Sequence, residues 1–65
     1  MFVEFHTLDG KDLFVNFALV YYVADAEVGS VLHFRDVQIP IKETIIDIKR
    51  QFQLMAMQGQ LAGRA

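Results

Sequence analysis

The stretch FVEFHTLDGKDLFVNF, residues 2–17, decides the fold. Apolar and polar side chains alternate over residues 2–8 and again over residues 13–17, which is typical of two strands with one buried face each. Between them lies Asp9-Gly10, a dipeptide that favours tight hairpin turns because glycine accepts a positive φ. We therefore expect residues 2–17 to form an antiparallel β-hairpin.

The next stretch of chain is predicted to turn and then to form a buried strand. Asn16 stands where the chain must turn, and its short amide can bond local backbone groups in an Asx-type turn. Residues 19–24 are then apolar or aromatic at every position, a pattern typical of a short strand covered on both faces. We expect the helix to cover one face and another partner to cover the second.

Two more strands are expected before the helix. Residues 25–30 are predicted to form a loop, after which the alternation over residues 31–35 indicates a fourth strand. A turn then leads into residues 37–41, where Pro40 lacks the N–H that a ladder needs and marks an edge or the end of the fifth strand. We expect one antiparallel sheet of about five strands, arranged as a β-meander.

The last third of the chain is expected to be helical over residues 44–62. Thr44 followed three residues later by Asp47 is typical of a capping box at a helix start. Two apolar stripes then run along nearly opposite sides of the helix. The inner stripe, expected to pack on the sheet, consists of Ile45, Ile48, Phe52 and Met55. The outer stripe, which needs a second partner, consists of Ile46, Leu54, Met57 and Leu61.

Length and composition favour self-association. A chain of 65 residues forms one domain, so we expect a single α+β domain over residues 1–65 with its sheet over residues 2–41. A domain of this size buries only about 60% of its unfolded surface, and cysteine is absent, so no disulfide compensates. With 54% hydrophobic and 22% charged residues, association is the economical way to cover apolar surface. We expect a homo-oligomer with Tyr21 and the outer stripe at its interface.

Charge and hydropathy exclude two kinds of partner. The formal net charge is −2, and the six basic residues are scattered along the chain. Duplex DNA is therefore not an expected partner. No segment approaches the roughly 20 apolar residues that cross a bilayer, and the N-terminus lacks the pattern of a signal peptide. We expect a cytoplasmic protein without a membrane span.

The sequence does not predict catalysis. Isolated glycines form no phosphate-binding loop, hydroxyl residues occupy structural positions, and carboxylates fall at turns and at the helix start. His6 and His33 are the two histidines, and without an assured third ligand they make a weak case for a metal. We therefore expect no catalytic residue, no cofactor and no metal site.

One group of side chains could bind a ligand. Tyr21 or Tyr22 offers an aromatic platform, with His33 and Arg35 on a neighbouring strand as donors for an anion or a base edge. We choose Tyr22, His33 and Arg35 as the candidate ligand residues. The alternative is that the tyrosines serve packing and that His33 and Arg35 form a solvated face.

Several short motifs together form a known pattern. They are Leu8-Asp9-Gly10-Lys11, Leu13–Asn16, Leu19–Val23 and Ile39–Ile48. With them the chain resembles, over about residues 2–52, the FlbD (SwrD) family of very small flagellar-operon proteins and short phage proteins of the same pattern. Asp9-Gly10 match the family's turn, Asn16 its strand-ending asparagine, and Lys42-Glu43-Thr44 its helix entry. The resemblance implies an interaction module and brings no catalytic residue.

These observations leave three functional hypotheses. The first is a homo-oligomeric interaction or regulatory module that binds protein partners, as the FlbD resemblance implies. The second is a phage-encoded homo-oligomer that sequesters a small anionic ligand, such as a signalling nucleotide, between subunits and acts as an anti-defence sponge. The third is an RNA-binding dimer of the carbon-storage-regulator type, for which the basic residues are few.

Overall fold

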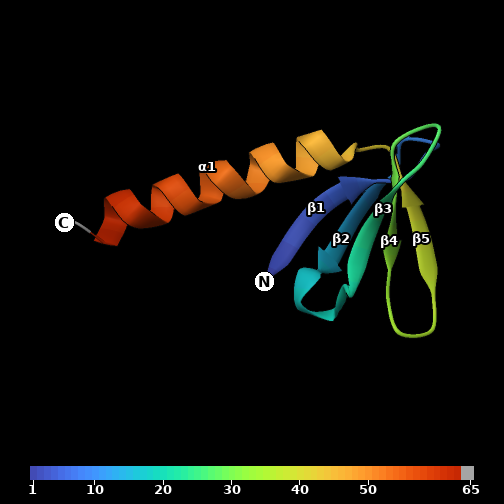
Figure 1. The fold of residues 1–65 in the computed structure, drawn as a ribbon, viewed down its shortest axis with the longest axis horizontal. Helices are drawn as coiled ribbons and strands as arrows, with labels where there is room; N and C mark the ends of the chain where they lie inside the picture. The colour runs from blue at the N-terminus through green and yellow to red at the C-terminus, as the bar shows by residue number, and fades with distance from the viewer. Residues whose placement is uncertain (64–65) are drawn as a thin grey trace.

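Over residues 1–63 the fold consists of five strands, a short 3-10 helix and one α-helix. The computed structural model describes the backbone of residues 1–63 and the side chains of residues 1–57. The elements are β1 (Phe2–His6), β2 (Asp12–Asn16), the 3-10 helix η1 (Phe17–Leu19), β3 (Tyr22–Asp25), β4 (Ser30–His33), β5 (Gln38–Ile41) and α1 (Ile45–Gly63) (Figure 1). The α+β class and the C-terminal helix are as predicted. The single five-stranded sheet is wrong, because the strands form two antiparallel sheets, β1–β2 and β3–β4–β5.

The first sheet is the hairpin that the opening stretch predicts. β1 and β2 pair in register from Phe2 opposite Asn16 to His6 opposite Asp12. In the connecting turn Gly10 adopts a φ of 87°, and its N–H donates to the carbonyl of Thr7 at 2.9 Å. Three-residue hairpin loops commonly consist of a tight turn and a following glycine in the left-handed region, as here.

A 3-10 helix separates the two sheets. The Oδ1 of Asn16 accepts a hydrogen bond from the N–H of Ala18 at 3.2 Å and so caps η1. The local turn predicted at Asn16 is confirmed. The strand predicted over residues 19–24 is wrong at its start, because Leu19 ends η1 and β3 begins at Tyr22. Within the described residues, β2 and β3 therefore do not pair.

The second sheet depends on a glycine at the start of its central strand. Gly29, just before β4, adopts a φ of 67°. A Cβ at this position would overlap the carbonyl oxygen of Ile41 and lie 2.9 Å from that of Lys42. β5 is an edge strand, as Pro40 indicates. The end of β5 therefore passes directly over a residue that has no side chain.

The core gathers apolar side chains from both sheets and from the first turns of α1. Its buried apolar members are Val3, Phe5, Val15, Leu32, Ile41 and Ile48. Phe17 and Phe52 extend it, since their rings meet edge to face with centroids 4.8 Å apart. Together these elements form one small core.

Helix α1 begins at the predicted capping box. The N–H of Thr44 donates to Oδ2 of Asp47 at 3.0 Å, and the N–H of Asp47 donates to Oγ1 of Thr44 at 3.1 Å. The inner stripe packs as predicted up to Phe52. The prediction for Met55 is wrong, because this side chain is 37% exposed. The C-terminal part of α1 runs past the sheets (Figure 1). In the described residues, no helix is long and apolar enough to cross a bilayer.

Candidate functional site

The far side of α1 carries apolar side chains that its own sheets leave uncovered. Ile46, Leu54 and Met57 of the outer stripe are 68%, 56% and 58% exposed. Leu61, the fourth member, lies outside the residues whose side chains are described. Burying one side chain of this kind is worth about 1.5–3 kcal/mol. The outer stripe is thus a surface on which a partner would gain stability.

The three predicted ligand residues are only partly brought together. Tyr22 and His33 are cross-strand partners, and their rings stack with centroids 4.2 Å apart and planes 11° apart. Arg35 follows the end of β4 and lies in the turn toward β5, where the N–H of Phe34 donates to the carbonyl of Val37 at 2.9 Å. The turn therefore separates Arg35 from the stacked pair.

Arg35 borders a hollow that involves the other tyrosine. The hollow has a volume of about 460 Å³, and its lining includes Leu19, Tyr21, Phe34, Arg35 and Asp36. Neither Tyr22 nor His33 lines it. The predicted ligand site is thus divided between two parts. One is the stacked pair of the exposed Tyr22 and the half-buried His33, and the other is a hollow lined by one cation, Arg35, and one carboxylate, Asp36.

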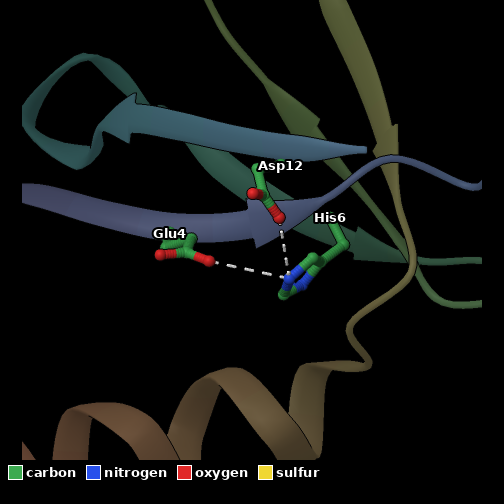
Figure 2. A group of neighbouring side chains, drawn as sticks. All are labelled: Glu4, His6 and Asp12. Atoms are coloured by element: carbon green, nitrogen blue, oxygen red, sulfur yellow. Dashed lines mark ion pairs between the residues drawn. The ribbon is translucent and has the colours of Figure 1, made fainter. Parts of the chain in front are cut away.

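The polar face of the β1–β2 hairpin carries a group that sequence reasoning missed. His6 and Asp12 are direct cross-strand partners, and Glu4 lies two residues before His6 on the same face. Nε2 of His6 lies 3.7 Å from Oε1 of Glu4 and 3.5 Å from Oδ1 of Asp12 (Figure 2). The signal was present in the sequence, because the Asp9-Gly10 turn sets the register that places residue 6 opposite residue 12.

Glu43 holds the other side of the His6 ring. Oε2 of Glu43 lies 2.6 Å from Nδ1 of His6, and Oε1 accepts the N–H of His6 at 2.9 Å. The N–H of Lys42 donates to the carbonyl of His6 at 2.8 Å. The buried hydroxyl of Ser30 donates to the carbonyl of Glu43 at 2.7 Å. The segment before α1 therefore ties β1 to β4 through Glu43.

No protein-family model, curated protein or solved structure matches this chain. The resemblance to the FlbD family stays a prediction. Among the described residues, surfaces that could serve a function include the outer stripe, the Tyr22–His33 pair with the hollow at Arg35, the polar hairpin face around His6, and the exposed Phe2–Phe14 pair.

Contact with Glu43 changes the acid–base properties of the polar hairpin face. The hydrogen bond to Glu43 is the main cause that raises the pKa of His6 above its ordinary value of 6.5, and the charges of Asp12 and Glu4 add to it. Partial burial by itself raises the pKa of Glu43, but hydrogen bonds from the ring and backbone of His6 outweigh it and lower the pKa below 4.5. In the folded protein the charged forms of both groups are favoured.

This ion pair predicts a pH dependence of stability. The pKa of His6 is raised on folding, so its contribution to the free energy of unfolding is fully present below about pH 6.5. This contribution is lost as the pH rises through the pKa of His6 in the folded protein. The contribution of Glu43, whose pKa is lowered, is present above about pH 4.5 and is lost as the pH falls through its folded pKa. We therefore expect the pair to stabilise the fold most between these two values.

Urea unfolding without divalent cations, at about pH 5.5 and about pH 8.5, measures this effect. His6→Gln is expected to reduce the difference in unfolding free energy between the two pH values. His33→Gln, at the other histidine, is the control and should leave that difference in place. The interpretation is wrong if both variants keep the pH dependence of the unmodified protein.

Proposed function

We propose that the protein is a non-enzymatic homo-oligomeric interaction module, in which the outer stripe of α1 docks on a second copy of the chain. The observation that carries this proposal is the exposure of Ile46, Leu54 and Met57 on the helix side that faces away from the core. A small chain without disulfides gains most from covering such a surface permanently.

The form of the helix supports a second copy as the occupant. α1 comprises 19 residues, so it is about 28 Å long, and its inner stripe packs only as far as Phe52. A helix end that projects beyond its own core is marginal in water and is stabilised by tertiary or quaternary packing. Leu54, Met57 and Leu61 follow at steps of three and four, the spacing of a helix–helix seam.

A second apolar surface supports binding of a protein partner by the oligomer. Phe2 and Phe14 are both exposed on the hairpin, and their rings stack with centroids 5.3 Å apart. Aromatic residues, phenylalanine among them, are enriched in protein interfaces. The FlbD resemblance supports a partner of the flagellar system and a cytoplasmic site of action.

Light scattering on the purified protein at micromolar concentration tests the proposal. We expect a mass that is a multiple of 7.4 kDa. Because association depends on concentration, the measurement is repeated up to about 100 µM. The mass of a single chain at every concentration would overturn the proposal.

A second candidate function is the sequestration of a small anionic ligand, such as a signalling nucleotide, as in a phage-encoded sponge. The stacked Tyr22–His33 pair favours it, because Tyr22 is 58% exposed and a flat aromatic surface accepts a base. Arg35, at the neighbouring hollow, supplies the cation that a phosphate group requires.

Thermal unfolding in the presence of cyclic and linear nucleotides checks this candidate. A ligand at about 100 times its Kd stabilises the folded state by about 2.7 kcal/mol, which raises the Tm of a domain of this size by about 10–20 °C. Arg35→Ala is expected to remove the rise in Tm, whereas Arg50→Ala, an exposed arginine on α1, should keep it. A Tm that no nucleotide changes contradicts the sequestration function.

A further inference from the structure

Three side chains on the polar hairpin face aim potential ligand atoms at one point. Nε2 of His6, Oε1 of Glu4 and Oδ1 of Asp12 come from two paired strands, and all three atoms lie within 4.8 Å of one another. In a tetrahedral zinc site, with bonds of about 2.0–2.2 Å, ligand atoms lie about 3.4 Å apart. The separations of 3.7 and 3.5 Å from Nε2 to the two oxygens are close to that spacing.

The orientation of the imidazole ring is set from outside this trio. Glu43, 37 positions away in the chain, lies 2.6 Å from Nδ1 and is only 19% exposed. Its backbone is held in turn by the buried Ser30. Metal-binding histidines almost always donate their other N–H to a carboxylate, a backbone carbonyl or a water molecule, and Glu43 is a partner of the first kind. With Nδ1 turned to Glu43, Nε2 faces Glu4 and Asp12.

The charge at this point also favours a cation. Three carboxylates, those of Glu4, Asp12 and Glu43, surround one imidazole. Among the described side chains, no lysine or arginine forms an ion pair with any of them, and Lys11 pairs instead with Asp9 at 3.8 Å. A divalent cation would balance this negative charge and take the place of the proton on Nε2.

We propose that Glu4, His6 and Asp12 bind a divalent transition-metal cation, with Glu43 as the partner that orients His6. One imidazole with carboxylates suits zinc and its neighbours in the first transition row better than magnesium or calcium. Three protein ligands leave one position open to water. Because Asp12 is 83% exposed, the site exchanges its ion freely with solvent.

Calorimetric titration of the full chain with Zn²⁺ alone tests the site. We expect one ion per chain, and a Kd that rises about tenfold or more in Glu4→Gln and in Asp12→Asn, each of which removes one ligand. Glu43→Gln is expected to raise it roughly 10–100-fold, as for other partners of ligating histidines. Asp9→Asn, on the same hairpin, is the matched control and should bind like the unmodified protein.

Histidine ring signals in the NMR spectrum identify the ligand atom. Zn²⁺ should shift the Nε2 signal of His6 and leave the ring signals of His33 unchanged. Glu4 and Asp12 are exposed, so circular dichroism of their variants should match the unmodified protein. The proposal is overturned if millimolar Zn²⁺ produces no heat, if His33 shifts in place of His6, or if Glu4→Gln and Asp12→Asn bind normally. Equal binding of Mg²⁺ would overturn the metal class.

Discussion

Replacing Leu54 and Met57 together by aspartate is expected to convert the oligomer into single chains. In the proposed assembly each substitution places a carboxylate in a dry helix–helix seam, where an unpaired charge costs several kcal/mol. In one copy both side chains are more than half exposed, so the two sheets and the first turns of α1 should keep their structure. Light scattering gives the mass, and circular dichroism measures how much helix the end of α1 loses without its partner. Met57→Asp with Leu61→Asp should act in the same way.

Ala56→Asp is the matched control for this experiment. Ala56 is exposed and adjoins Met57 in sequence, but a rotation of about 100° per residue places it on another side of α1. It adds one carboxylate, against two in the double variant, without entering the outer stripe, so the oligomer should persist. An unchanged mass in the Leu54 and Met57 double variant would place the interface elsewhere, with exposed Tyr21 before β3 as the next surface to substitute.

Gly29→Ala is expected to abolish the folded state. The positive φ at this position strains any L side chain, and the new Cβ would overlap the carbonyl oxygen of Ile41. Backbone atoms cannot turn away as a side chain does, so β4 and β5 would have to separate. We expect a loss of about 4 kcal/mol or more, which is comparable with the whole stability of about 3–10 kcal/mol of a domain of this size.

Gly10→Ala isolates the conformational part of that loss. Gly10 also has a positive φ, but a Cβ there would meet no atom within 4 Å. We expect it to cost about 1–2 kcal/mol, measured by urea unfolding of both variants. If the two glycine variants lost equal amounts of unfolding free energy, the role assigned to the carbonyl of Ile41 would be contradicted.

Local patterns made part of this fold predictable. The alternation on either side of Asp9-Gly10 specifies a hairpin, since a period of two places every second side chain on one face. Thr44 and Asp47 mark the helix start because their hydrogen bonds close within three residues. In both cases the residues that determine the structure are neighbours in the sequence.

The division into two sheets was not predictable in the same way. Phe17, Ala18 and Leu19 are apolar and merge in sequence with the strand that follows, so nothing marks them as a 3-10 helix apart from the cap at Asn16. The helical repeat predicts which side of α1 Met55 lies on, but it does not predict how far the sheets extend along the helix. The exposure of Met55 depends on that extent. Tertiary context decided both outcomes.

The candidate sites show the same limit. Placing Glu4 and His6 on one polar face follows from alternation, and Asp12 follows from the hairpin register. The contact of His6 with Glu43 spans 37 positions and has no local signature. Arg35 departs from Tyr22 and His33 because the turn at Phe34–Val37 begins one residue before it.

The hydrogen bonds between Glu43 and His6 of β1 affect the order in which the parts of the protein fold during synthesis. The hairpin leaves the ribosome before β3, β4, β5 and α1, and it can form on the microsecond scale. The backbone of His6 finds its partner only when Lys42 and Glu43 follow, and closures over such separations are slow. α1 begins two residues after Glu43. The core is therefore completed as α1 emerges, and the surface proposed for assembly is presented after both sheets have emerged.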